Sequence, residues 1–118
     1  MYQMTHQHHY FQGKRYLTRG IINRLDPKIL GGIWFLLDQF LKNDRIITDY
    51  LQIFKLETVT KNGNYLLQIS HEQEEPLYVN EAALVYQVNQ IINEKVYVIS
   101  DIDGSGNEYS TMLLASEY

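Results

Sequence analysis

The sequence predicts an α+β domain, in which an antiparallel sheet of about five strands carries one principal amphipathic helix packed on one face. Two observations support this fold class most strongly. An apolar stripe with the period of a helix follows Asp26-Pro27, and Asn62-Gly63 separates two strand-like runs. The length of 118 residues, with 45% hydrophobic and 20% charged residues, fits one globular domain, which we place at residues 15–118.

Residues 1–14 are expected to form a flexible polar tail, because they follow neither the helix period nor the strand period. Tyr10-Phe11-Gln12-Gly13 resembles the cleavage sequence of an affinity tag, which suggests that part of the tail was added to the natural chain. His6, His8 and His9 could chelate a divalent metal, but a stable site needs further fixed ligands. We therefore predict no metal site.

A first strand is expected at Arg15–Ile21, where β-favouring side chains alternate with charged ones. The principal helix begins after Asp26, whose carboxylate suits the N-cap, and at Pro27, which suits the first helical position. It continues to Lys42. Its apolar stripe, which should face the sheet, consists of Ile29, Leu30, Ile33, Trp34, Leu36, Leu37, Phe40 and Leu41.

Two features of this helix need separate explanations. Phe35 lies outside the apolar stripe and is expected on the exposed side. Gly31 and Gly32 each cost about 1 kcal/mol relative to alanine inside a helix, so a close approach to another element should offset that cost. We expect this approach within the domain, and contact with a partner chain is the alternative.

Two hairpins are predicted further along the chain. Asn-Gly joins a strand at 49–59 to a strand at 65–71, and bulky side chains on both faces make the first of them central or bulged. Residues 80–92 fit a strand better than a helix, because their apolar side chains alternate. The last hairpin joins 95–100 to 108–114.

Asp101-Ile102-Asp103-Gly104-Ser105-Gly106 resembles the first half of an EF-hand calcium loop, in which positions 1, 3 and 5 supply oxygens and position 6 is glycine. Position 12, however, is Met112, which cannot supply the closing carboxylate. Strand-like segments also flank this string where an EF-hand has helices. We interpret it as an acidic hairpin turn and not as a metal site.

The net charge of −4 is unevenly distributed along the chain. Residues 1–70 contain nine Lys/Arg and five Asp/Glu, a balance of +4, whereas residues 71–118 contain nine Asp/Glu and one Lys, a balance of −8. Pairing between strands of opposite charge explains this pattern most simply. The alternative is an acidic face that attracts a basic partner. The acidic balance argues against direct nucleic-acid binding, which usually requires a basic patch.

The sequence lacks the residues and motifs that most catalytic mechanisms require. Without cysteine there are no disulfides or thiol chemistry, and neither a Gly-x-Ser-x-Gly elbow nor a phosphate-binding loop is present. The carboxylates lie in hydrophilic turns, and His71 is expected to be solvated or hydrogen-bonded. We therefore predict no catalytic residues and no cofactor. No apolar run reaches the roughly 18 residues of a membrane span, and we expect a cytoplasmic protein.

Ten tyrosines stand beside one tryptophan and four phenylalanines. Tyrosine combines apolar area with a polar tip and is enriched at interfaces, although it is also a common strand residue. Together with the acidic C-terminal half, these tyrosines suggest a protein-binding surface. The candidate partner-binding residues are Phe35, Glu72, Glu74, Glu75, Asp101, Asp103, Glu108 and Tyr109.

Three stretches stand out beside the helix that bears Trp34, namely Arg15–Ile21, Asp49–Phe54 and Glu108–Leu114 followed by Glu117-Tyr118. Together they resemble a small Firmicute family of staphylococcal type, the domain of unknown function numbered 960. The resemblance runs from Arg15 to the end of the chain. It implies a small cytosolic bacterial α+β protein and brings no established activity. The tail and an expanded turn at 105–107 depart from the family pattern.

We therefore favour a non-enzymatic protein-binding module or regulator that uses an acidic, tyrosine-bearing surface. Its partner is expected to be a protein, and a basic one would complement the acidic surface. One alternative is an inhibitor that occupies the basic groove of a nucleic-acid-binding protein. Another is a small-molecule-binding protein or enzyme, which would need a pocket with convergent polar groups. No membrane association is expected, and the sequence leaves the oligomeric state open.

Overall fold

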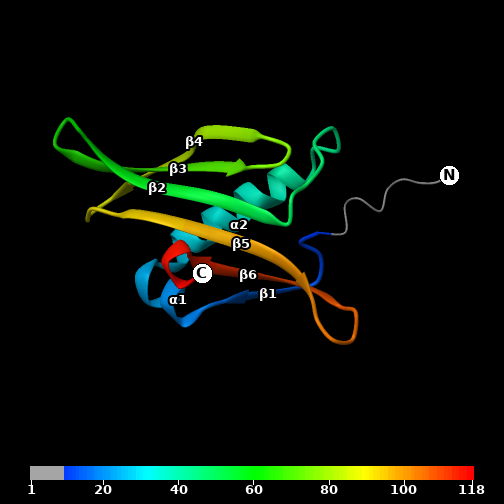
Figure 1. Ribbon diagram of the computed structural model, residues 1–118. Helices are drawn as coiled ribbons and strands as arrows, with labels where there is room; N and C mark the ends of the chain where they lie inside the picture. Colours follow the sequence, from blue (N-terminus) through cyan, green and yellow to red (C-terminus); the bar gives the residue numbers. More distant parts are fainter. Residues whose placement is uncertain (1–9) are drawn as a thin grey trace.

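Six strands form one mostly antiparallel sheet with two α-helices in the computed structural model, which describes residues 10–118 (Figure 1). The strand order is β1-β6-β5-β2-β3-β4, and the β1–β6 pair is parallel. The α+β class is confirmed, and the expected five strands become six. The elements are β1 (Lys14–Leu17), α1 (Arg19–Arg24), α2 (Pro27–Leu41), β2 (Leu51–Lys61), β3 (Asn64–Gln73), β4 (Tyr78–Val88), β5 (Asn93–Ile102), β6 (Glu108–Leu114) and the 3₁₀ helix η2 (Ala115–Glu117).

The predicted hairpins are confirmed. Asn62 and Gly63 both adopt positive φ angles, 53° and 79°, as a tight two-residue turn between β2 and β3 requires. β2 lies between β5 and β3, which explains the bulky side chains on both of its faces. The ambiguous segment is the strand β4. Between β5 and β6, Asp103 Oδ1 accepts hydrogen bonds from the backbone N–H groups of Ser105 (2.8 Å) and Asn107 (3.0 Å), so the calcium-like string is a hairpin turn.

The predicted first strand, Arg15–Ile21, is wrong in its second half. The strand ends at Leu17, and α1 begins after Thr18, whose Oγ1 accepts a hydrogen bond from Ile21 N at 3.2 Å. This cap satisfies a free N–H group of the first turn, and the turn carries Ile21 fully into the core. The local cap and the burial of one isoleucine outweigh the alternating pattern.

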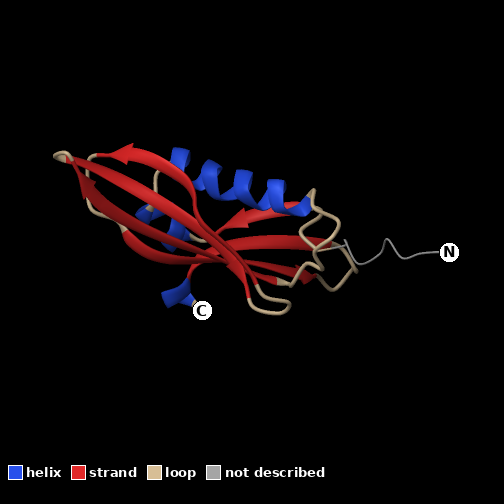
Figure 2. Ribbon diagram, turned by 90° about the horizontal axis from the view of Figure 1, so that it is seen from above, coloured by secondary structure: helices blue, strands red, loops and turns tan. Residues whose placement is uncertain are grey.

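α2 matches its prediction closely. Asp26 Oδ1 accepts from Ile29 N at 3.0 Å, and Pro27 occupies the first turn. The helix lies across one face of the sheet (Figure 2), and its buried residues are Ile29, Leu30, Gly32, Ile33, Leu36, Leu37 and Phe40. Phe35 is 50% exposed on the outer side, as expected.

The two glycines of α2 have different surroundings. A Cβ atom on Gly32 would lie 2.2 Å from the Tyr86 hydroxyl of β4, whereas one on Gly31 would meet nothing within 4 Å. The predicted close approach within the domain is therefore present at Gly32. Gly31 takes no part in it.

Residues 10–14, which the sequence placed in a flexible tail, lie against the domain. Phe11 is only 2% exposed, and its backbone N–H donates to Ser100 Oγ at 3.0 Å. Gly13 has a φ of 81° and approaches the Glu108 carbonyl so closely that a Cβ atom would lie 2.3 Å from it. Residues 10–14 therefore pack as part of the domain. His6, His8 and His9 lie outside the described residues.

Ion pairs join the two differently charged halves of the sequence. Within residues 10–118, Arg24 pairs with Glu94, and Lys55 Nζ lies 3.2 Å from Glu72 Oε1. A third pair, Arg15 with Asp38, stays inside the basic half. Folding therefore neutralises part of the sequence asymmetry, in agreement with the simpler of the two charge interpretations.

Candidate interaction surface

The side of the sheet opposite α2, here called the open face, is formed by every second strand residue. Gln52 and Phe54 of β2 point toward the helix side and are buried, so Leu51 and Ile53 point to the open face. Register then defines two neighbouring rows of side chains across β6, β5 and β2: Leu113, Tyr97 and Ile53, followed by Thr111, Ile99 and Leu51. The centre of the open face is therefore apolar, and within it Ile53 (2% exposed) and Leu113 (9%) are already buried by their neighbours.

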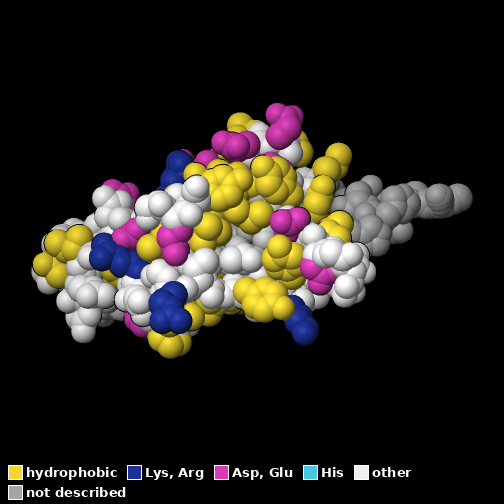
Figure 3. Space-filling model, turned by 60° about the horizontal axis from the view of Figure 1, so that its bottom comes forward, with side chains coloured by type: hydrophobic (Ala, Val, Ile, Leu, Met, Phe, Trp, Pro, Cys, Tyr) yellow, Lys and Arg dark blue, Asp and Glu magenta, His cyan; other side chains and the backbone are white. Residues whose placement is uncertain are grey.

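Tyrosines lie within and around these rows, and we call Tyr16, Tyr50, Tyr97, Tyr109 and Tyr118 the tyrosine cluster. Tyr97 and Tyr118 meet edge to face with ring centroids 5.5 Å apart, and Tyr16 and Tyr109 do so at 5.9 Å. Tyr50 precedes β2, and Tyr16, Tyr50 and Tyr118 are all exposed. Figure 3 views the molecule obliquely from the side of β1, and hydrophobic side chains gather in its upper part beside acidic ones.

Carboxylates collect at one end of the open face, here called the acidic end. The β3–β4 and β5–β6 turns lie at the same end of the sheet (Figure 1). Ser100 N donates to Tyr50 O at 2.9 Å, which sets Asp101 beside Asp49, and Glu75 N donates to Asp49 Oδ2 at 3.4 Å. The acidic end comprises Asp49, Glu74, Glu75 and Asp101.

The electrostatics of Tyr50 reflect this arrangement. The pKa of its phenol is raised above the ordinary 10.0, chiefly by charge repulsion from the Tyr118 phenolate, then by partial desolvation and a hydrogen bond with Tyr118, and least by the carboxylates of Asp49 and Glu74. The carboxylates at the acidic end therefore contribute only the smallest part of this shift. Their negative charge would favour a cationic group of a partner.

Two lysines border the apolar rows on the side away from the acidic end. Lys55 and Lys95 lie opposite each other across β2 and β5. Lys55 is paired with Glu72, and Lys95 Nζ lies 5.8 Å from the centre of the Tyr97 ring. Both charges are therefore already engaged with neighbours on the open face. The open face therefore has an acidic end, an apolar centre, and a far side where the lysine charges are balanced by neighbouring side chains.

The structure gathers some of the sequence-predicted partner residues and separates others. Glu74, Glu75 and Asp101 lie at the acidic end, with Tyr109 directly opposite Asp101. Glu72 borders the apolar rows, opposite Ile53. Asp103 of the β5–β6 turn and Glu108 of β6 line a cleft together with Tyr109 and Tyr16. Only Phe35, on the outer surface of α2, lies apart from the other predicted residues.

Sequence reasoning missed Tyr16, Tyr50, Tyr97 and Tyr118 as members of one surface. The alternation of Tyr97, Ile99 and Asp101 along β5 was a signal that these side chains share a face. Placing Tyr16 and Tyr118 beside them required the strand order. That order depends on contacts between distant parts of the chain.

On the helix side, a buried polar network holds the strands near the acidic end. His71 Nε2 donates to Gln52 Oε1 at 2.7 Å, because the Gln52 amide nitrogen already donates to Gln73 Oε1 and to Asp49 O. Gln73 Nε2 in turn donates to the carbonyls of Ile47 and Pro76, both at 2.8 Å. The network fixes the loop that carries Asp49 and the β3–β4 turn, and so positions the acidic end.

His71 itself is only 1% exposed and lies among aromatic rings. It stacks on Phe54 at 4.3 Å and meets Phe40 and Tyr78 edge to face at 5.0 and 5.5 Å. Burial lowers its pKa from 6.5 to about 4. The imidazole is therefore neutral at pH 7, and its role is structural.

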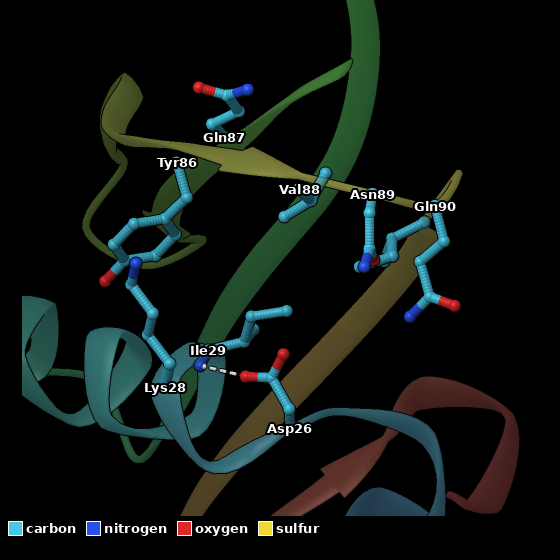
Figure 4. Close-up of a pocket in the computed structure, with 9 residues that line it drawn as sticks. Asp26, Lys28, Ile29, Tyr86, Gln87, Val88, Asn89 and Gln90 are labelled. Atoms are coloured by element: carbon cyan, nitrogen blue, oxygen red, sulfur yellow. Dashed lines mark hydrogen bonds between the residues drawn. The ribbon is translucent and has the colours of Figure 1, made fainter. Parts of the chain in front are cut away.

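A cleft between the start of α2 and the end of β4 is one alternative site (Figure 4). The carboxylate of Asp26 is occupied as the helix cap, and Lys28 Nζ lies 5.2 Å from the centre of the Tyr86 ring. The remaining side-chain polar groups are the Tyr86 hydroxyl, which packs against Gly32, and the amides of Asn89 and Gln90, whereas Gln87 points to the other side of β4 (Figure 4). These groups can donate and accept hydrogen bonds but supply no evident nucleophile. Within residues 10–118, no group of three or more His, Asp or Glu residues could hold a metal ion.

Fold and surface together define a small α+β protein whose sheet is covered by helix on one face and carries an aromatic surface on the other. The chain belongs to the family of domain of unknown function 960, described as staphylococcal protein of unknown function, whose model matches residues 14–117. None of the helices described for residues 10–118 is long and apolar enough to cross a membrane.

The fold also occurs in a solved structure. The crystal structure of a protein of unknown function from Enterococcus faecalis is similar, with 19% sequence identity and a TM-score of 0.58 over 89% of this chain and 90% of that chain. At this identity the likeness shows the fold alone. Comparison with curated proteins gives no match.

Proposed function

We propose that this protein is a non-enzymatic protein-binding module or regulator that binds its partner through the open face. The observation that carries the proposal is the tyrosine cluster on a sheet face opposite the helix. Exposed Tyr16, Tyr50 and Tyr118 offer large contact areas with few rotatable bonds. Each also brings a hydroxyl that can bond to a partner at the rim of an interface.

The proposed partner presents a basic surface. Asp49, Glu74 and Asp101 supply negative charge at one end of the apolar rows. Tyrosine rings next to them accept arginine or lysine through cation–π contacts worth about 0.5–1 kcal/mol at exposed positions. An exposed basic patch on a regulator fits this requirement, and so does the basic groove of a nucleic-acid-binding protein.

Affinity capture from a lysate of the native host tests the proposal. The Tyr50→Ser/Tyr118→Ser double variant removes two exposed rings from the open face, and Phe35→Ser removes one from the opposite side of the molecule. We expect a saturable partner that the wild type and Phe35→Ser retain and the double variant loses. Its capture should weaken as salt rises, since the acidic end contributes to binding.

The proposal fails if no saturable partner is captured, or if the double variant captures the same partner as strongly as the wild type. Both variants are first compared with the wild type by thermal unfolding. Equal melting temperatures ensure that a loss of capture reports the surface and not the fold.

A further inference from the structure

The two edges of the sheet are protected to different degrees. A strand at a sheet edge presents unpaired N–H and C=O groups that can pair with another chain. β1 forms one edge, has four residues, and includes the charged residues Lys14 and Arg15. β4 forms the other edge and has eleven residues. The short length and the charges of β1 limit its pairing with another chain. β4 is long, and part of it carries no charge.

A bulge divides β4 into two parts. Ile69 pairs with Leu84 and His71 with Asn80, so Ser70 alone faces residues 81–83. Ala82 has a φ of 47°, and its N–H donates to Ser70 Oγ at 3.0 Å. Bulges turn an edge away from incoming strands, and Glu81 adds a charge at this point. The first part of β4 therefore carries two protective features.

The second part, residues 84–88, carries none of them. Its sequence, Leu-Val-Tyr-Gln-Val, is uncharged, contains no proline, and pairs regularly with β3 over its whole length. Within the described chain, no loop or turn backbone hydrogen bond involves these five residues. Tyr86 anchors the segment on α2, where its hydroxyl packs against Gly32. The free edge is therefore both fixed in place and open to pairing.

We propose that residues 84–88 of β4 pair with the same segment of a second copy of this chain. Antiparallel pairing centred on Tyr86 sets Leu84 opposite Val88 of the second copy, and Val85 opposite Gln87. Uncharged residues then meet uncharged residues on both faces, although the whole chain carries a charge of −4. The segment is complementary to itself, which is what a twofold interface requires.

Pairing of this kind joins two six-stranded sheets into one. A twofold axis perpendicular to the sheet keeps both copies of α2 on one side and both open faces on the other. A contact of five residues per chain is small by the standard of stable interfaces, so the dimer should be weak and concentration-dependent. This inference stands independently of the proposed function.

Sedimentation velocity over a wide concentration series tests the inference with two matched variants. Val79 and Val85 are both 49% exposed and lie on β4 on either side of the bulge. Val85→Lys places a charge in the pairing segment, and Val79→Lys places the same charge outside it. We expect concentration-dependent dimers for the wild type and Val79→Lys, and at least a tenfold weaker association for Val85→Lys.

The inference is overturned if the wild type stays monomeric at every concentration, or if both lysine variants weaken association equally. Hydrogen exchange adds a second readout, in which amides of residues 84–88 become more protected as the protein concentration rises. If Val85→Lys no longer captured a different protein but still associated with itself like the wild type, the edge would pair with a strand of that protein. That result would contradict the dimer. Tyr50→Ser/Tyr118→Ser should dimerise as the wild type does, which separates this test from that of the open face.

Discussion

The two faces of the sheet are built from the same strands, but one forms the core and the other forms an exposed surface. On the helix side, Phe54, Leu67 and Val96 are completely buried beneath α2. On the open face, neighbours along the same strands such as Tyr97 and Ile99 remain half-buried, and Tyr50 is exposed. The same strand register thus produces a fully buried core on one face and exposed aromatic area, available for contact with a partner, on the other. Mutations on the helix side should accordingly affect mainly the stability of the protein, and mutations on the open face mainly the binding of a partner.

The largest expected effect on stability lies on the helix side. Leu37 is fully buried in the stripe of α2, so Leu37→Ala should lower the free energy of unfolding by about 2–5 kcal/mol. The exposed Tyr50→Ser on the other face should change it by about 0.5 kcal/mol or less. Urea denaturation of both variants measures the difference. Equal losses would contradict the division between the faces.

A pH-dependent effect of roughly 3 kcal/mol should come from His71. Its pKa is about 4 in the folded protein against 6.5 ordinarily, so the unfolded chain binds the proton first as the pH falls. The contribution of the neutral imidazole is complete above pH 6.5 and is lost progressively down to about pH 4.

His71→Gln provides the comparison, because glutamine is neutral and can still donate to Gln52. The variant should be less stable at pH 7, since it loses the stacking on Phe54. Its unfolding free energy should fall less than that of the wild type between pH 6.5 and pH 4. Identical pH profiles would show that His71 is not the titrating group.

A smaller effect distinguishes the two glycines of α2. Gly32→Ala places a methyl group against the Tyr86 hydroxyl and should destabilise the protein by about 1–2 kcal/mol, even after the gain in helix propensity. Gly31→Ala enters open space and should stabilise it by about 0.5–1 kcal/mol. Thermal unfolding gives both signs. Adding Tyr86→Phe to Gly32→Ala should recover part of the loss, and no recovery would refute the proposed contact.

Local signals in the sequence predicted much of the covered face. Asp26-Pro27, the stripe of α2 and Asn62-Gly63 each depend on neighbours in sequence, and each is found in the structure. The strand predicted at Arg15–Ile21 was wrong in its second half, because a helix cap at Thr18 and the burial of Ile21 override the alternating pattern. Local reasoning was reliable where no distant contact competed with it.

The open face was predicted only in part. Asp101 and the Glu74-Glu75 turn come from hairpins far apart in the chain, and only the strand order brings them to one end of the sheet. Tyr16 joins Tyr109 through a parallel pair of strands that no local pattern indicates. Composition indicated a tyrosine-bearing surface, but long-range pairing determined which tyrosines form it.

Site-specific photo-cross-linking in cells of the native host tests the role of the open face most directly. A benzoyl-phenylalanine placed at Tyr50 samples the open face beside the acidic end, and the same group placed at Phe35 samples the exposed side of α2. The account predicts a discrete cross-linked protein at position 50 and none at position 35. Cross-links only at position 35, or none at either position, would contradict it.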